Sequence, residues 1–206
     1  WSWALCAFLD GHPKYQAEFR KLSQDVALAD FDQRFTRLIG DQWRELSIEW
    51  RLFIANLEYG HELSKTAVDF TPGQLLTAPV HVKVPADQGW TNTGVLLSAG
   101  ETVHISATGR FQVADKLDGK PRIWESEANG VSFRYYKGRP LGMLLAAVIP
   151  NSNDPEDASQ LWRPLPIGLK ATLRPQKTGT LFLRINDSAA ELRDNQDALD
   201  AEIRPE

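Results

Sequence analysis

Hydrophobic residues repeat with two different periods along this chain, and the change of period limits what it can fold into. Up to about residue 68 they recur every three or four positions, as on one face of an amphipathic helix. From residue 79 onward they recur every second position, as in a strand with one buried face. The stretch between contains the turn-forming pair Pro72-Gly73. The sequence therefore predicts an α+β chain in two parts: a helical unit at residues 1–68, a linker at 69–78 and a β module at 79–206.

The helical part is predicted to contain short helices separated by residues that begin or end helices. Asp10-Gly11 ends the first helix, Pro13 opens the second, Gly40 ends the third, and a fourth ends near Gly60. The apolar faces of these helices are too large to be buried among the helices alone, so we expect them to pack on the β module or on preceding sequence. These faces include Trp43, Trp50, Phe53 and Leu57.

No catalytic motif can be assigned to this helical part. It contains no HExxH, no cluster of cysteine and histidine, and no GxSxG. His12 and His61 adjoin helix ends and are interpreted as turn residues rather than ligands. The single cysteine, Cys6, has no partner for an internal disulfide and is expected to fill the helical core.

The alternating runs after residue 79 are short, and glycine, proline and asparagine separate them. Short strands at near-regular spacing with such punctuation are typical of an antiparallel β-sandwich. The runs are Val80, Val82 and Val84; Val95 and Leu97; Val103, Ile105 and Ala107; Val131, Phe133 and Tyr135; Leu169, Ala171 and Leu173; Leu181, Leu183 and Ile185; and Leu199, Ala201 and Ile203.

An oxygen-rich loop, residues 186–195, joins the last two of these runs. Asp187, Asp194 and Asn195 gather at its two ends, an arrangement that suits a hard cation such as calcium, which binds roughly six to eight oxygens. The loop lacks the central glycine and terminal glutamate of an EF-hand. An ordinary acidic hairpin loop, with Asp187 capping a turn and Asn195 in a left-handed conformation, remains open as the alternative.

Three segments of the β module resemble a known family. Residues 89–113, 129–148 and 166–196 are similar to the LecA-like (PA-I) family of calcium-dependent, galactose-binding bacterial lectins. The shared features include a small-residue strand that ends at Gly109 and the closing run in which a leucine-rich strand leads into Asn186-Asp187. The similarity covers about residues 78 to 206 and implies a lectin-like, galactose-binding-domain-like β-sandwich that binds Ca²⁺.

The resemblance also implies a set of site residues. The family's bidentate aspartate falls on Asp187, its two asparagine ligands on Asp194 and Asn195, and its two carbonyl ligands on Val113 and Glu191. In the family the ion holds two neighbouring sugar hydroxyls, and the family's sugar-contacting histidine and glutamine are replaced here. The implied carbohydrate-binding residues are Asp187, Ser188, Glu191, Asp194, Ser126, Asn129 and Trp124.

The loop at residues 114–128 carries Trp124 beside Glu125 and Glu127. In the lectin resemblance this loop borders the sugar site, where an exposed tryptophan can stack on a sugar ring and carboxylates can accept its hydroxyl protons. Alternatively, Trp124 packs on the edge of the sandwich or on the helical unit. Glu125, Glu127 and Asp187 are also candidates for the paired carboxylates of a glycosidase, but a metal site explains the Asp187 loop more completely.

Residues 1–68 resemble the helical C-terminal part of gluzincin-type zinc metallopeptidase-like proteins. In such proteins the HExxH helix comes earlier, so the resemblance implies that any catalytic residues precede this chain. The chain opens at Trp1 within an apolar pattern and its only methionine is Met143, which also predicts that it is a fragment of a longer product. We therefore expect no peptidase activity from this chain alone, and possible packing against an upstream peptidase domain.

A formal net charge of −4 and the lack of any basic run argue against nucleic acid and anionic membranes as partners, and no apolar stretch is long enough to span a bilayer. We expect a calcium-dependent carbohydrate-binding module that recognises a glycan or polysaccharide, joined to the C-terminal helices of a metallopeptidase-like protein. The resemblances imply a bacterial, secreted protein of the periplasm, cell envelope or extracellular space. Two alternatives remain open: a structural, calcium-stabilised sandwich for protein–protein or envelope assembly, and a non-catalytic part of a zinc peptidase.

Overall fold

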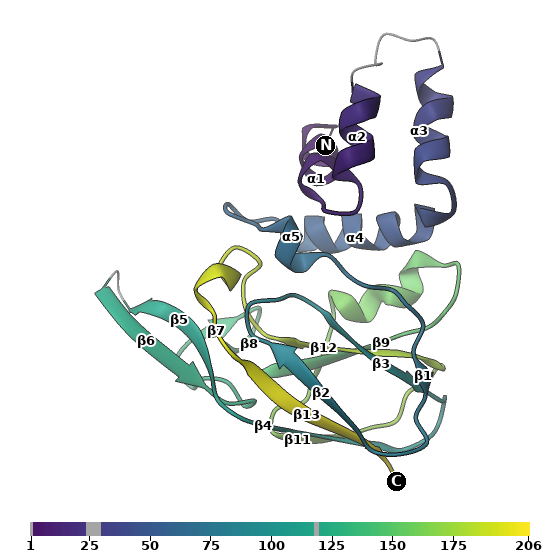
Figure 1. Ribbon diagram of the computed structural model, residues 1–206. Coiled ribbons are helices and arrows are strands. Elements are labelled where there is room, and N and C mark those ends of the chain that lie inside the picture. The colour runs from purple at the N-terminus through teal and green to yellow at the C-terminus, as the bar shows by residue number, and fades with distance from the viewer. Residues whose placement is uncertain (1, 24–29, 118–119) are drawn as a thin grey trace.

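The first part of the chain is helical (Figure 1). The structure is a computed structural model and describes residues 2–23, 30–117 and 120–206. The helices are α1 (Ser2–Gly11), α2 (Gln16–Ser23), α3 (Phe31–Ile39), α4 (Trp43–Ala55) and the single turn α5 (Leu63–Thr66). Gly40 ends α3 with a positive φ of 42°, a conformation that glycine adopts without strain, and its N–H bonds the Thr36 carbonyl. The predicted helix ends at Gly11 and Gly40 are confirmed.

The second part forms two main sheets and two hairpins. One sheet has the order β1-β3-β12-β9-β10 and the other the order β11-β4-β13-β2; the hairpins are β5–β6 and β7–β8. Within the described residues β1 pairs with β3 in parallel, and the other pairings are antiparallel. The strands are β1 (Gln74–Leu75), β2 (Val80–Pro85), β3 (Thr91–Leu97), β4 (Val103–Thr108), β5 (Phe111–Leu117), β6 (Lys120–Ser126), β7 (Tyr135–Tyr136), β8 (Arg139–Pro140), β9 (Leu144–Ile149), β10 (Leu165–Pro166), β11 (Lys170–Leu173), β12 (Gly179–Ile185) and β13 (Ala198–Pro205).

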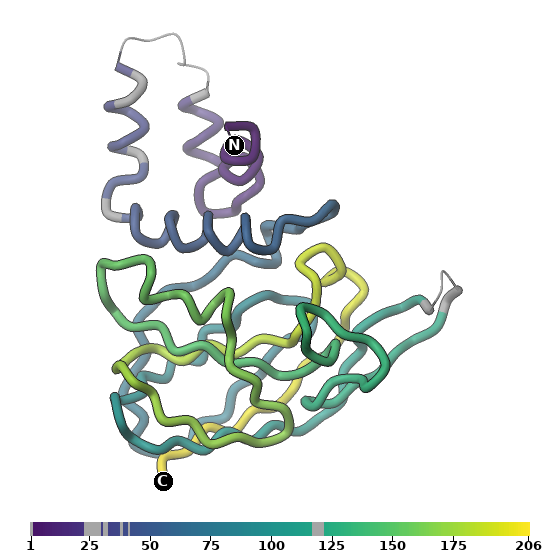
Figure 2. Tube along the Cα trace, turned by 180° about the vertical axis from the view of Figure 1, so that it is seen from behind, coloured from purple at the N-terminus to yellow at the C-terminus, as the bar shows by residue number. Residues whose placement is uncertain are grey.

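One apolar cluster joins the two main sheets. Both β12 and β13 contribute alternate residues to it, as the period of two predicts. Its members include Val84, Leu97, Ile105, Leu144, Leu181, Leu183, Ile185, Leu199, Ala201 and Ile203, all 1% exposed or less. The hairpin β5–β6 extends sideways from these sheets (Figure 2). The alternation predicted over residues 131–135 is wrong for its later part, because Phe133 and Tyr135 are 68% and 61% exposed.

The helical part covers the outer face of the five-stranded sheet. Figure 1 shows α4 lying between the sheet and the helices α2 and α3. Ile48 and Leu52 of α4 share a second buried cluster with Phe182 of β12 and Trp90. The helices therefore pack on the β part, and the residues that make this contact are Ile48 and Leu52. Trp50 and Phe53 instead face a third cluster among the helices, and Trp43 remains 59% exposed.

Strand β12 is consequently buried on both faces. Besides the predicted Leu181, Leu183 and Ile185, its outer residues Thr180, Phe182 and Arg184 are at most 9% exposed. A 3-10 helix, η2 (Pro155–Leu161), closes the same outer face with Ala158 and Leu161 buried. By contrast, Cys6 of α1 is exposed, so the prediction that it fills the helical core is wrong. No helix within the described ranges is both long and apolar enough to cross a bilayer.

Candidate functional site

The oxygen-rich loop crosses from one main sheet to the other, from the end of β12 to the start of β13. Its first residue, Asn186, is 3% exposed and donates from Nδ2 to the carbonyls of Tyr136 (3.1 Å), Arg139 (3.2 Å) and Pro140 (2.9 Å). A short 3-10 helix, η3 (Leu192–Asp194), lies near its other end. Asn186 therefore attaches the loop to the β7–β8 turn.

Asp187 is a buried carboxylate at the base of the loop, 1% exposed. Its Oδ1 accepts from the Ser188 N–H at 2.7 Å, and its Oδ2 accepts from Nδ2 of Asn195 at 2.7 Å. Burial raises the pKa of Asp187 to about 7, despite these two hydrogen bonds. No lysine, arginine or histidine of the described residues forms an ion pair with this carboxylate.

Asp194 and Asn195 add two buried oxygens that lack hydrogen-bond donors. Oδ1 of Asp194 and Oδ1 of Asn195 are both buried without a partner among the described residues. The other carboxylate oxygen of Asp194 accepts from the Asp115 N–H at 3.3 Å, and burial raises the pKa of Asp194. A buried acceptor without a donor costs about 1–3 kcal/mol. Since no donor among the described residues reaches either oxygen, a cation or a water molecule could satisfy them.

Strand β5 runs along the same loop and brings its backbone close to it. Gln112 and Gln196 exchange backbone hydrogen bonds of 3.0 and 3.2 Å, and Nε2 of Gln112 donates to the Asp194 carbonyl at 2.5 Å. Val113, which follows Gln112, is therefore held beside the loop. Glu191 precedes η3, and its side chain accepts from Nη2 of Arg134 at 3.0 and 3.1 Å.

The donor set of this loop fits a hard cation better than a soft one. Across the described residues no group of three histidine, cysteine, aspartate or glutamate side chains is placed to hold a metal. The loop instead combines two carboxylates, one amide oxygen and neighbouring carbonyls, which are the oxygen ligands that calcium takes. Of the sequence-predicted residues, Asp187 and Asn195 are in direct contact, whereas the Asp194 carboxylate faces the Asp115 N–H of β5.

The residues expected to contact a sugar are arranged differently. Ser126 is 4% exposed and its hydroxyl donates to the Glu127 carbonyl at 3.0 Å, while Oδ1 of Asn129 accepts from the Leu169 N–H at 3.0 Å. Both side chains are thus committed to the backbone. The hydroxyl of Ser188 is also occupied, because it donates to Oε2 of Glu58 at 2.5 Å.

Trp124 is buried, so the expectation of an exposed tryptophan that stacks on a sugar is wrong. It is 8% exposed and its ring meets Phe133 edge-on, with 4.8 Å between centroids. The alternative, in which Trp124 packs on the edge of the β part, describes it correctly, because β6 pairs Trp124 with the buried Ala114 of β5. The exposed rings here are Phe133 and Tyr135, which flank the Arg134 that binds Glu191.

A buried polar network inside the helical part was missed by the sequence analysis. His12 is 2% exposed and its Nε2 lies 2.9 Å from Oε1 of Glu49. The same carboxylate accepts from the Tyr15 hydroxyl at 3.0 Å and from the Val68 N–H at 2.9 Å. His12 therefore lies in the turn between α1 and α2, as predicted, but its side chain is buried and bonded. The sequence signal for a buried Glu49 was its spacing on α4 relative to the apolar residues that are buried there: Leu46, Ile48, Leu52 and Phe53.

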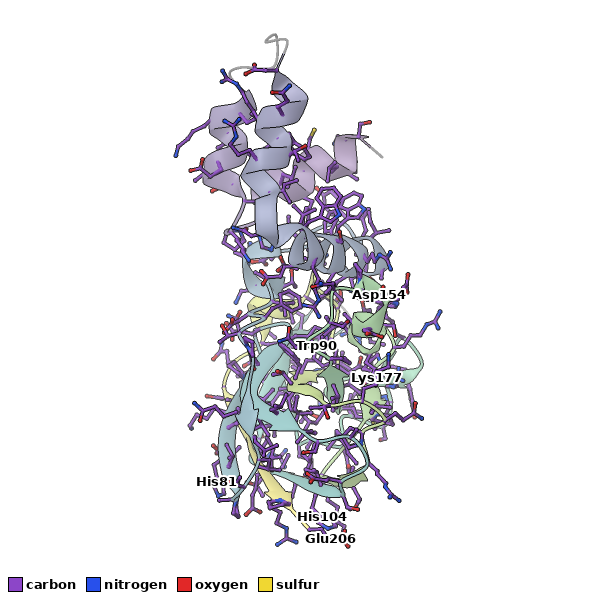
Figure 3. All side chains as sticks on the ribbon, turned by 90° about the vertical axis from the view of Figure 1, so that its right-hand side faces the viewer. His81, Trp90, His104, Asp154, Lys177 and Glu206 are labelled. Atoms are coloured by element: carbon purple, nitrogen blue, oxygen red, sulfur yellow. The ribbon has the colours of Figure 1, made fainter. Side chains whose placement is uncertain are left out.

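A cavity of about 20 Å³ lies between this network and β12, bordered by His12, His61 and Arg184. His61 bonds the Asn56 carbonyl at 3.1 Å and the Thr66 hydroxyl at 3.0 Å, and burial lowers its pKa. Such a cavity has room for roughly one water molecule and none for a peptide substrate. His81 and His104 lie near the far end of the molecule (Figure 3), so the four histidines form no common site.

Comparison with known proteins finds likenesses among solved structures only. No family model and no curated protein sequence matches this chain. Solved structures matched by the chain include one titled "EclA N-terminal domain; PllA-like lectin", with 23% sequence identity, a TM-score of 0.43, and coverage of 64% of this chain and 98% of that one. The chain is thus similar to a lectin domain at a low level. The resemblance of residues 1–68 to metallopeptidase-like proteins remains a prediction.

Proposed function

We propose that the β part of this chain is a calcium-dependent carbohydrate-binding module whose cation site is the loop at residues 186–195. The observation that carries the proposal is the pair of buried oxygens without donors on the consecutive residues Asp194 and Asn195, of which Asn195 contacts the buried carboxylate of Asp187. The ligands would be these three side chains together with the carbonyls of Val113 and Glu191. When bound, Ca²⁺ would neutralise the carboxylates and offer open positions to two neighbouring sugar hydroxyls.

The chemistry of the ligands also bears on where the protein works. Two carboxylates and one amide are a modest ligand set, and calcium sites in extracellular modules have dissociation constants of about 10⁻⁴ to 10⁻³ M. A site of this strength fills only where calcium is abundant. We therefore infer that the protein acts outside the cytosol, in the cell envelope or in the extracellular space.

The surroundings of the loop favour a glycan over a free monosaccharide. Ser126 and Asn129 are bound to the backbone and offer little selection for galactose. Phe133, whose ring contacts Trp124 edge-on, is exposed and can stack on the apolar face of a sugar. We expect weak binding of a single sugar, with a dissociation constant near 1 mM, equivalent to about −4 kcal/mol.

A structural role for the cation without sugar is the second candidate. It is favoured by one observation, the attachment of the loop to the helical part through Ser188 and Glu58. On either alternative we propose that this chain is not itself an enzyme, and that residues 1–68 are the C-terminal helices of a peptidase-like domain. Binding of a glycan separates the two candidates.

The cation site is tested by thermal and chemical denaturation with calcium and with a chelator. Calcium at a hundredfold excess over its dissociation constant should raise the free energy of unfolding by about 2.7 kcal/mol. Asp187→Asn should lose most of this gain, because Asp187 supplies a negative charge and two oxygens to the proposed site. Asp200→Asn is the matched control, since Asp200 is exposed on β13. Equal stability of the unaltered chain in calcium and chelator would reject the site.

The sugar is tested on a glycan array with and without calcium. We expect signals on oligosaccharides with neighbouring hydroxyls that vanish in chelator and in Asp187→Asn, and that fall severalfold in Phe133→Ser. Tyr59→Ser is the control for loss of an exposed ring, because Tyr59 is fully exposed in the helical part. Calcium binding without any calcium-dependent glycan signal would leave the structural role.

A further inference from the structure

The loop at residues 186–195 is held from outside by the segment between α4 and α5, as Figure 1 shows near α5. The Glu62 N–H donates to the Ala189 carbonyl at 3.2 Å, and Nε of Arg193 lies 3.0 Å from Oε1 of Glu62. Glu58 accepts from the Ser188 hydroxyl at 2.5 Å. Two residues of the helical part thus make three contacts with one loop, although Glu58 and Ser188 are 130 residues apart in sequence.

A further attachment comes from Arg184 at the end of β12. Its Nη2 donates to the carbonyl of Asp187 at 2.7 Å, and its guanidinium lies 5.5 Å from the centroid of the Trp90 ring. Arg184 also borders the small cavity that His61 closes from the helical side. The burial of Arg184, and through it the position of the Asp187 backbone, therefore depends on the helical part being in place.

The contacts and the candidate ligands alternate along the loop. Asp187 is followed by Ser188 and Ala189, which bind the helical part, and Arg193, which also binds it, is followed by Asp194 and Asn195. Each contacting residue is therefore within two positions of a candidate ligand. A displacement of the helical part would move the backbone that carries the ligand oxygens. Ordering a free backbone costs about 1–2 kcal/mol per residue. Docked helices would keep the loop ordered before the cation binds, so this cost would not reduce the affinity for the cation.

We propose that the helical part regulates the cation site: docking of residues 58–62 on the loop orders the ligands, and a bound cation in turn holds the helical part against the sheet. This inference rests on the proposed cation site. Two binding events that share one ordered element strengthen each other by the same factor, because the coupling is reciprocal. Such couplings are typically 5–150-fold.

The test is the calcium affinity of variants that loosen the contact without touching a ligand. Arg193→Gln removes a positive charge near the site, so electrostatics alone would tighten calcium binding, whereas loss of the contact should weaken it about tenfold. The side chain of Arg193 is 80% exposed, so its replacement leaves the core intact. Arg51→Gln is the matched control, because Arg51 joins the helical part to Glu156 of η2, away from the loop.

Titration calorimetry gives the affinities, and amide exchange of α5 with and without calcium gives the reverse effect. We expect tenfold weaker binding for Arg193→Gln, unchanged binding for Arg51→Gln, and slower exchange in α5 when calcium is bound. Unchanged or tighter binding by Arg193→Gln, together with calcium-independent exchange, would overturn the coupling and leave the cation site standing. Failure of the unaltered chain to bind calcium would overturn both.

Discussion

Arg184→Leu is expected to lower the free energy of unfolding by about 2–4 kcal/mol. Arg184 is 9% exposed on β12 and donates to the carbonyls of Asp187 at 2.7 Å and Ile185 at 3.3 Å. Leucine would fill part of the space but would leave both carbonyls without these donors under the helical part. It would also remove the contact of the guanidinium with Trp90.

Urea denaturation at neutral pH measures this loss, and the melting temperature should fall with it by about 2–4 °C for each kcal/mol. Arg204→Leu on β13 is the control, since Arg204 is exposed and its replacement should change stability by no more than about 0.5 kcal/mol. A similar, small loss for both variants would mean that the helical part does not bury Arg184 in solution.

Glu49→Ala is expected to destabilise the protein by about 3–5 kcal/mol. Glu49 is 4% exposed and accepts three hydrogen bonds, from His12, Tyr15 and the Val68 N–H. Burial raises the pKa of Tyr15, so its hydroxyl keeps its proton and needs an acceptor. Alanine would leave three buried donors unpaired at the point where α1, α4 and the chain after α5 meet.

The same denaturation experiment on Glu45→Ala provides the comparison. Glu45 lies one turn earlier on α4 and its carboxylate binds Lys14 at the surface, so its loss should change stability by at most about 1 kcal/mol. If Glu49→Ala were as stable as Glu45→Ala, water would have to reach the network between His12 and Glu49. Near-ultraviolet circular dichroism of the aromatic rings around Phe8 would then reveal a loosened helical cluster.

The strands of the β part could be predicted because one face of each is buried in a single core. This holds for Leu199, Ala201 and Ile203, whose neighbours along β13 point outward. It fails for β12, where Phe182 and Arg184 are buried by helices that come from the other end of the chain. A period of two reports one buried face, and nothing local indicates that a second layer will cover the other.

The candidate site was predictable to the same extent. Asp187 and Asn195 lie within one loop, so their contact follows from the turn between two strands. The sequence left open whether Trp124 is buried, because its burial involves a contact with Phe133 from a separate segment. The contacts of Glu58 and Glu62 with the loop join residues more than a hundred positions apart and leave no periodic trace in the sequence.

The pairing of β2 with β13 sets the order in which this protein can assemble. Residues 80–85 bond to residues 198–203, and β13 is also the inner neighbour of β4. Strand β2 has no partner until β13 has been made more than a hundred residues later, and β4 pairs only with the later strands β11 and β13. Folding rates fall as contacts become more distant in sequence, and unpaired strand edges promote aggregation while they wait. The yield of folded protein should therefore be higher when the chain is synthesised slowly at low temperature, because each strand edge then pairs within its own chain before it contacts another chain.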